Sequence, residues 1–350
     1  MVVLYYKYVA IASTEAELQC FVEEHTALCR SLELTGRVRI AKEGINGTLG
    51  GTADRVREYV AHMSALERFA DVDWKTSASD VRPFPELLVR RVQEIVALEL
   101  PDDECDPTRG GTHLTPEQFH DAQLHASPSK VALIDVRNNY EYNIGHFEGA
   151  INPNTRCFSQ FPGWVRSNLD ELQKKDKILM YCTGGIRCEK ASAYLKHLGL
   201  SNVYQLQGGI HRYLERFPDG GRFQGKNFVF DQRVAMASDD MTVAGRCEKC
   251  EIPHDVISGV RCQYCRIHVL LCESCREEIP IELVFCAEHA SLVQGSLQQL
   301  MDKASALQTQ MHLETGQHRK GKRRSLRKQI DIVEARIRSL APAAPMQVIP

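Results

Sequence analysis

Four close pairs of metal-binding side chains in the last third of the chain constrain its fold most strongly. Seven of the 13 cysteines lie between residues 247 and 286, and the pairs read Cys247-x-x-Cys250, Cys262-x-x-Cys265, Cys272-x-x-Cys275 and Cys286-x-x-His289. Eight soft ligands at this spacing fill two tetrahedral zinc sites and leave no position open for catalysis. We therefore predict two structural zinc ions, with disulfides or an iron–sulfur cluster as alternatives. The spacing leaves open which pairs share an ion.

The rest of the composition is that of an ordinary globular protein. A length of 350 residues suits two or three compact units, and 43% hydrophobic with 25% charged residues argues against wholesale disorder. The net charge is only −2, so any attraction to nucleic acid has to come from local patches. The chain begins without the basic leader and apolar segment of a signal peptide, and no run reaches the roughly 20 apolar residues of a membrane helix. We expect a soluble cytoplasmic protein with no membrane partner.

Residues 1–100 have the pattern of a ferredoxin-like α+β domain of the acylphosphatase-like kind. The expected order is β-α-β-β-α-β. It has strands at 2–9, 38–40, 72–74 and 87–92, and helices at 15–34 and 54–66. The glycine-rich run 43–51 is expected to turn the chain.

A doubly wound α/β domain with a mostly parallel sheet is predicted for residues 115–222, after a polar linker at 101–114. Its expected elements are strands at 131–136, 177–181 and 203–206, and helices at 116–124, 163–172 and 187–198. The zinc-binding module is expected at 223–292, and a basic helical tail at 293–350. In the tail an apolar seam predicts a helix that folds back on residues 297–311 through a turn near Thr315-Gly316. The seam consists of Leu326, Ile330, Val333, Ile337 and Leu340.

The segment after the strand at 177–181 carries the strongest catalytic signal. It reads Cys182-Thr183-Gly184-Gly185-Ile186-Arg187-Cys188, which is a strand end, a glycine loop and a helix start. A cysteine at the carboxyl edge of a parallel sheet faces backbone N–H groups and a helix N-terminus, and together with Arg187 these favour the thiolate. We expect the pKa of Cys182 to fall below the free value of about 8.5. The alternatives are an inert buried cysteine or a loop that binds phosphate without using the thiol.

Three motifs occur in order along this domain and share one family resemblance. The loop motif is Cys182-x-x-Gly185-x-Arg187, which is similar to the six-residue active loop of the rhodaneses. The upstream motif runs from Leu133 through Asp135, Arg137, Glu141 and His146 to Ala150, and the downstream motif is Gly208-Gly209-Ile210-x-x-Tyr213. The resemblance implies that the loop cysteine accepts a sulfane sulfur and that residues 183–186 form the anion- and substrate-binding loop. We expect Asp135 and Arg137 to make ion pairs and His146 a polar contact.

Three segments extend the pattern beyond these motifs, namely residues 39–51, the extended loop 182–192 and Gly225-Lys-Asn-Phe-Val-Phe-Asp-Gln-Arg233. Together they resemble one rhodanese subfamily, the tRNA uridine hydroxylases. The resemblance implies conversion of the wobble uridine of tRNA to 5-hydroxyuridine, with molecular oxygen as co-substrate and Cys182 as the essential thiol. Cys188 would be a second redox thiol or, alternatively, a packed helix-face cysteine. The run 43–51 would cradle RNA phosphate or form a plain hairpin turn.

Local basic residues are the candidates for holding tRNA. The first domain offers Lys42, Lys75, Arg90 and Arg91, and the tail has seven cations between 319 and 328, including Lys322, Arg323 and Arg324. A nuclear import signal and a solvated helix start are the alternatives for the tail.

Two other functional classes remain open on sequence alone. The same loop suits a sulfurtransferase that takes sulfur from a small donor such as thiosulfate and carries it as a persulfide on Cys182. A non-catalytic zinc-binding adaptor for RNA or protein is the second alternative, although intact Cys182 and Arg187 weigh against it. No flavin or nicotinamide fingerprint occurs in the sequence.

Overall fold

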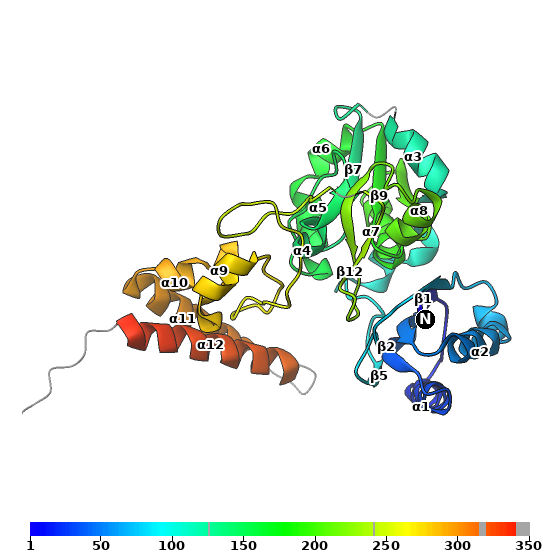
Figure 1. The fold of residues 1–350 in the computed structure, drawn as a ribbon, viewed down its shortest axis with the longest axis horizontal. Coiled ribbons are helices and arrows are strands. Elements are labelled where there is room, and N and C mark those ends of the chain that lie inside the picture. Colours follow the sequence, from blue (N-terminus) through cyan, green and yellow to red (C-terminus); the bar gives the residue numbers. More distant parts are fainter. Residues whose placement is uncertain (125–126, 241, 315–319, 341–350) are drawn as a thin grey trace, which may run out of the picture. The chain divides into compact units, whose positions relative to one another are not determined.

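The computed structural model describes residues 1–124, 127–240, 242–314 and 320–340, without the side chains of 320 and 321. The chain forms two compact units, Met1–Gly245 and Arg246–Pro350 (Figure 1). In the described part, no helix is both long and apolar enough to cross a membrane.

The first unit begins with a five-stranded sheet of order β4-β1-β3-β2-β5. Pairings among the first four strands are antiparallel, and β5 runs parallel to β2. The predicted order β-α-β-β-α-β is confirmed from β1 to β4, although its third strand is the glycine-rich run expected to be a turn, and β5 is an additional edge strand. The elements are β1 (Val2–Tyr8), α1 (Glu15–Ser31), β2 (Thr35–Ala41), β3 (Gly44–Gly50), α2 (Ala53–Ser64), a 3-10 turn (Glu67–Phe69), β4 (Lys75–Ser77) and β5 (Leu87–Arg91).

Both helices lie against the same face of this sheet. Thr14 caps α1 in a capping box with Glu17, and Thr52 caps α2, so each helix begins where its first free N–H groups find an oxygen. Their apolar sides bury Val22 and Val56 against Val3 and Ile45 of the sheet. The opposite face of the sheet therefore carries no helix of this domain.

Two expectations for this domain were wrong. The glycine-rich run is not a turn, because Gly44–Gly50 is the central strand β3 and the chain turns at Lys42–Glu43. Glycine is needed there for close packing, since a Cβ at Gly47 would lie 2.4 Å from the Tyr5 hydroxyl. The strand expected at 72–74 begins instead at Lys75, because Val72 and Trp74 pack on the apolar core before pairing with β1 starts.

A parallel four-stranded sheet of order β6-β10-β9-β7 follows, as predicted for a doubly wound domain. Helices α5 to α7 bury apolar side chains on one face, and α3 and α8 on the other. The elements are β6 (Thr112–Leu114), α3 (Pro116–Leu124), β7 (Val131–Asp135), α4 (Asn139–Tyr142), β8 (Gly145–Phe147), α5 (Phe161–Ser167), α6 (Leu169–Gln173), β9 (Lys177–Tyr181), α7 (Ile186–His197), β10 (Val203–Leu206) and α8 (Gly209–Arg216).

Three details of this domain differ from the expected pattern. The helix at 163–172 is broken at Asn168, whose side-chain amide donates to the Trp164 carbonyl. The polar segment 101–114 contains two 3-10 turns, Asp102–Glu104 and Pro107–Arg109, and ends in β6, an edge strand of the sheet. The segment after residue 222 starts with β11 (Phe223–Phe228), which pairs with β8 and with β12 (Ala235–Ala237), so the compact Cys-rich unit begins only at Arg246.

The second unit joins the Cys-rich loops to a pair of helices through one apolar core. Leu326, Ile330 and Val333 are buried there as the seam predicts, whereas Leu340 is 38% exposed. The expected turn near Thr315-Gly316 lies outside the described residues. The elements are α9 (Glu273–Glu278), α10 (Ser291–Gln294), α11 (Leu297–Leu313) and α12 (Lys320–Leu340), with 3-10 turns at Ile281–Leu283 and Ala287–His289.

Candidate functional site

The loop between β9 and α7 holds Cys182 with no exposed surface. The backbone of Gly185 is left-handed, with φ of 105°, which a side chain would disfavour. In this conformation the Gly185 N–H donates a hydrogen bond to the Cys182 sulfur at 3.1 Å. The loop thus aims a backbone donor at the sulfur directly before the N-terminus of α7.

The surroundings of Cys182 favour its thiolate. Burial opposes ionisation, but the hydrogen bond from the Cys188 thiol, the charge of Arg187 and the N–H groups of Arg187 and Cys188 outweigh it and lower the pKa of Cys182 to about 6. This is the direction that the sequence predicted. Burial and the neighbouring Cys182 raise the pKa of Cys188 well above its ordinary value. At neutral pH the pair is therefore one thiolate and one thiol.

Arg187 has a partner that the sequence analysis missed. Its guanidinium binds the buried Glu141 carboxylate through two hydrogen bonds of 2.7 Å, and Thr183 donates to the same carboxylate at 3.3 Å. The Asn138 N–H also donates to Glu141, which fixes the carboxylate at the start of α4. Glu141 neutralises the charge of Arg187 and anchors its side chain. Arg187 therefore fixes the geometry of the loop in addition to favouring the thiolate. The only signal in the sequence was an acidic residue inside the first motif.

The structural roles expected for the first rhodanese motif are confirmed. Arg137 forms a buried ion pair with Asp135 at 2.6 Å and also donates to the Gly145 carbonyl. The Nδ1 atom of His146 lies 3.0 Å from the Tyr142 carbonyl oxygen. These contacts hold the segment that carries Glu141.

Strand β1 of the N-terminal sheet covers the Cys182 loop. A Cβ at Gly185 would lie 2.8 Å from the Tyr6 hydroxyl oxygen, and one at Gly184 would lie 3.2 Å from a Leu4 methyl. The Tyr6 hydroxyl donates to Glu189 at 2.8 Å, and the Tyr8 hydroxyl donates to the Ile186 carbonyl at 3.3 Å. The sulfur is thus shielded from water in this conformation.

Lys75, expected among the RNA-binding cations, belongs to this cover instead. It is 1% exposed, lies 2.7 Å from the Asp73 carboxylate and stands 5.5 Å from the centre of the Tyr6 ring. Burial lowers the pKa of Lys75, and Asp73 opposes the shift. A side chain so placed is not free to bind RNA phosphate from solution.

The other RNA-binding candidates differ in how far their charges are engaged. Lys42 and Arg91 both form ion pairs with Glu15, at 2.9 and 3.2 Å, whereas Arg90 is exposed. In the second unit Lys322 pairs with Glu314 at 2.6 Å, while Arg323 and Arg324 are exposed on α12. The role of these residues in RNA binding stays a prediction.

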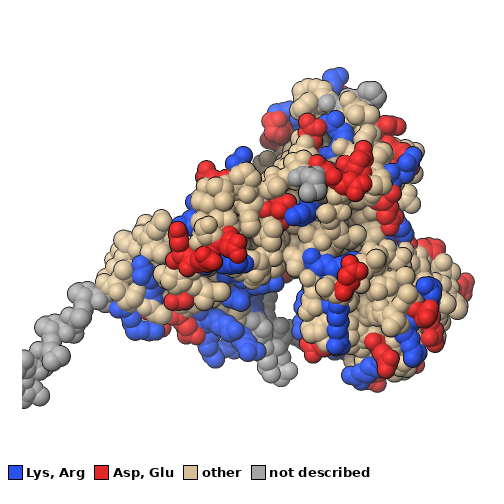
Figure 2. Space-filling view, viewed as in Figure 1, with Lys and Arg blue, Asp and Glu red and all other residues tan. Residues whose placement is uncertain are grey.

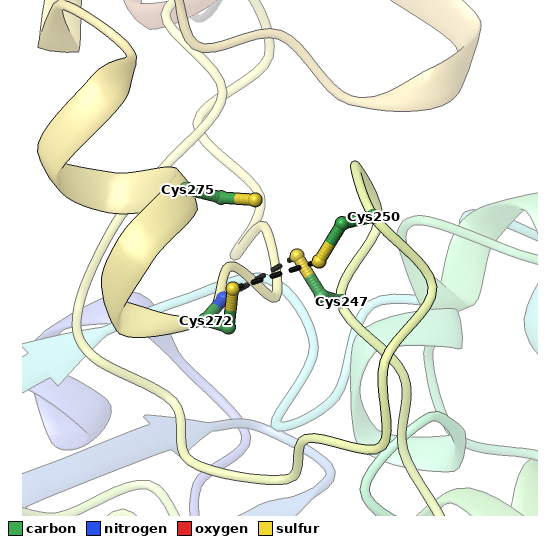
Figure 3. A group of neighbouring side chains, drawn as sticks. All are labelled: Cys247, Cys250, Cys272 and Cys275. Carbon is green, nitrogen blue, oxygen red and sulfur yellow. Dashed lines mark hydrogen bonds between the residues drawn. The ribbon is translucent and has the colours of Figure 1, made fainter.

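The four chelating pairs come together in an interleaved way, which the sequence left open. The first and third pairs form one group, and the second and fourth form the other, with the ligand atoms of each group within 4.8 Å of one another. In the first group, drawn in Figure 3, the Cys250 and Cys272 sulfurs are 3.6 Å apart. In the second, the Cys265 and Cys286 sulfurs are 3.8 Å apart. All 13 cysteines lie in the described part of the chain and none forms a disulfide, so the groups can hold metal ions.

Comparisons with known proteins give matches along most of the chain. Family models match an acylphosphatase-like domain of UPF0176 at residues 1–95, a rhodanese-like domain at 115–216 and a rhodanese C-terminal region at 224–289. Rhodanese-like domain-containing protein 6 of Arabidopsis thaliana is 37% identical over 315 residues, which are 82% of this chain and 53% of that one. A rhodanese-related structure from Thermoplasma volcanium is 22% identical, covers 30% of this chain and 92% of its own, and has a TM-score of 0.24.

Bacterial relatives match most of both chains. The tRNA uridine(34) hydroxylase of Listeria welshimeri is 40% identical over 265 residues, which are 75% of this chain and 78% of the relative. That of Staphylococcus saprophyticus is 41% identical over 248 residues, which are 70% and 76% of the two chains. The chain belongs to the tRNA uridine(34) hydroxylase family.

Proposed function

We propose that this protein hydroxylates the wobble uridine of tRNA at C5 and that the Cys182 thiolate is the reacting group. The observation that carries the proposal is a buried sulfur that accepts a hydrogen bond from the Gly185 N–H at 3.1 Å, beside Arg187 and the Cys188 thiol, and these neighbours lower its pKa to about 6. The relatives named above supply the substrate class. Arg187 and Cys188 complete the catalytic set, and residues 183–186 form the loop that holds the reacting base.

The chemistry follows from one thiolate next to one thiol. Addition of the Cys182 sulfur to C6 of the uracil ring makes C5 nucleophilic toward oxygen, which gives a C5 hydroperoxide. The Cys188 thiol then reduces the hydroperoxide and becomes a sulfenic acid, and elimination of Cys182 releases 5-hydroxyuridine. Attack of the Cys182 thiolate on the sulfenic acid gives a disulfide. In total, uridine, oxygen and two thiols give 5-hydroxyuridine, water and a disulfide, which an external dithiol reduces.

The uracil base reaches Cys182 only if the cover formed by β1 moves. Leu4 and Tyr6 lie against the glycines of the loop, and the sulfur has no exposed surface. The Tyr6 and Tyr8 hydroxyls hold the cover together with the buried Lys190 of α7, which pairs with Glu43 at 2.8 Å and with Glu94 at 2.7 Å. Because β1 is paired with β3 and β4 on its two sides, we propose that tRNA binding moves the N-terminal sheet as a whole away from the loop, and that its return excludes water during the reaction.

For the Cys-rich unit we propose two structural zinc ions. Four ligands at about 2.3 Å from a tetrahedral zinc stand about 3.8 Å apart, close to the observed sulfur separations. The donor sets are four cysteines in one group and three cysteines with His289 in the other, and both sets are typical of closed structural sites. Zinc there holds loops that have few regular elements of their own.

For the tRNA partner we propose that exposed cations of both units contribute to binding. Three arginines are exposed, namely Arg90 of the first unit and Arg323 and Arg324 of the second. Three further cations now pair with a glutamate and would have to leave it to bind phosphate, namely Lys42, Arg91 and Lys322. We also propose that catalysis belongs to the domain at 115–222 and metal binding to the part of the chain that follows it.

A sulfurtransferase is the rival function, because the Gly185 N–H would stabilise a persulfide on Cys182 as well as a thiolate. The two functions are separated by nucleoside mass spectrometry of tRNA from cells that lack the protein. Absence of 5-hydroxyuridine at the wobble position supports the hydroxylase. Unchanged 5-hydroxyuridine together with rapid sulfur release from thiosulfate by the purified protein would support the rival.

A further inference from the structure

The face of the N-terminal sheet that lacks helices carries a row of arginines. Strand register places Arg39 opposite Asn46, which in turn lies opposite Tyr6, and it places Arg90 opposite Arg39. Paired residues of neighbouring strands point to the same face of a sheet, and so do residues two apart in one strand. Arg37, Arg39 and Arg90 therefore share the face on which Tyr6 covers the Cys182 loop. We call these three residues the arginine stripe.

The charges of the arginine stripe are not neutralised by the protein. All three side chains are exposed, and within the described ranges none of them has a carboxylate partner. Arg91, the next residue along β5, points to the other face and pairs with Glu15. Two like charges directly opposite one another, as at Arg39 and Arg90, cost folding stability unless an anion lies between them. Figure 2 shows Lys and Arg side chains gathered in a column over β2 and β5.

The arginine stripe lies near β1, the strand that covers the reacting sulfur. In the sheet order, β3 separates β1 from β2, so the stripe on β2 starts about 10 Å from the strand that covers the loop. Guanidinium groups bind phosphate through two parallel hydrogen bonds. A nucleic-acid strand whose phosphates lie on the stripe would present a neighbouring base toward Tyr6 and the loop beneath it.

We propose that the arginine stripe is the surface that binds the tRNA backbone next to the reacting uridine. The proposal rests on the proposed function, because it takes tRNA as the substrate, and it deepens that function by naming the binding face. Charge complementarity and the shared face with Tyr6 favour RNA over an acidic protein as the occupant. The glycine-rich strand β3 then serves as the flat centre of this surface rather than as a phosphate-binding loop.

The test compares two charge-matched double variants of the full-length protein. R39Q/R90Q removes two charges of the stripe, and R55Q/R57Q removes two arginines of α2 that pair with Glu58 and Asp54 on the helical side. Binding to unmodified tRNA is measured without turnover at several salt concentrations. The slope of log affinity against log salt should become shallower by about 1.4 to 1.8 for R39Q/R90Q, which corresponds to two lost phosphate contacts, and should stay unchanged for R55Q/R57Q.

The outcomes separate this proposal from the hydroxylase assignment. Equal slopes for R39Q/R90Q and the wild-type protein would overturn the arginine stripe, and binding of the stripe to an acidic protein would then be the remaining explanation. Melting curves show whether each variant is folded. At saturating tRNA, R39Q/R90Q should keep its turnover rate while its KM rises, because the stripe lies outside the loop. Persistence of 5-hydroxyuridine in cells without the protein would instead overturn the hydroxylase assignment and leave the binding result standing.

Discussion

Cys182 in the first unit and Cys262 in the second are equally buried, with no exposed surface on either residue, but they have different neighbours. Around Cys182 are a backbone N–H, one thiol and the ion pair of Arg187 with Glu141. Around Cys262 are three further ligands, all within 4.8 Å. A thiolate without a metal can attack a substrate, whereas a thiolate in a closed four-ligand group stabilises the fold. The donor set around a cysteine, rather than its burial, separates the two roles.

The largest expected effect is on the second unit when one ligand is removed. C262S should lower the zinc content from two ions per chain to one, because three remaining ligands hold zinc poorly. Binding of structural zinc contributes on the order of 10 kcal/mol to folding, so the core of Cys-rich loops and helices should open to proteases. Metal analysis and limited proteolysis measure both effects. C20S, at an exposed cysteine, is the control, and an unchanged zinc content in C262S would refute the two-site assignment.

The next largest effect concerns the ion pair of Arg187 with Glu141, next to the loop that carries Cys182. E141Q leaves the buried Arg187 without its charged partner and should destabilise the first unit by about 3–5 kcal/mol. D54N, which breaks the exposed pair with Arg57, should have little effect. Urea unfolding followed by tryptophan fluorescence compares the two variants. Equal midpoints would mean that the pair of Arg187 with Glu141 does not hold the loop.

A smaller effect is expected on the titration of Cys182. With a pKa of about 6 when folded and about 8.5 when unfolded, the native state binds fewer protons between these values. The contribution of Cys182 to stability therefore increases with pH through this window and is lost as pH falls through 6. C188A removes a hydrogen bond to the thiolate and should raise the pKa of Cys182. Thiolate absorbance, taken as the difference from matched C182S proteins, tests this shift, and an unchanged pKa would remove Cys188 from the ionisation mechanism.

The smallest expected effect is on tRNA binding by the second unit. R323Q/R324Q removes two exposed charges of α12 and leaves the buried seam at Leu326 and Ile330 intact. If both arginines contact phosphate, the salt slope should become shallower by about 1.4 to 1.8. S325A and S339A, on the same helix, are uncharged controls. An unchanged slope would limit the second unit to structural and targeting roles.

Features with a local pattern could be predicted from the sequence. The parallel strands Val131–Asp135 and Lys177–Tyr181 each contain four consecutive apolar residues, and the chelating pairs have fixed short spacing. The contacts missed by the sequence analysis join residues far apart in the chain, such as Arg187 with Glu141 and Tyr6 with Glu189. Neither helical nor strand periodicity in a sequence indicates contacts between residues so far apart in the chain. The run 43–51 misled because glycine usually marks turns, whereas here it allows a tyrosine ring to pack against a strand.

The central claim is that oxygen enters the wobble uridine through Cys182. Cells that lack the protein can be supplied with wild-type, C182S or C157S genes and grown under ¹⁸O₂, with tRNA nucleosides then analysed by mass spectrometry. Cys157 is an exposed cysteine of the same domain and serves as the matched control. We predict ¹⁸O-labelled 5-hydroxyuridine with wild-type and C157S, and a loss of roughly 10³-fold or more with C182S. Labelled 5-hydroxyuridine at wild-type levels with C182S, or unlabelled product with the wild-type protein, would contradict the account.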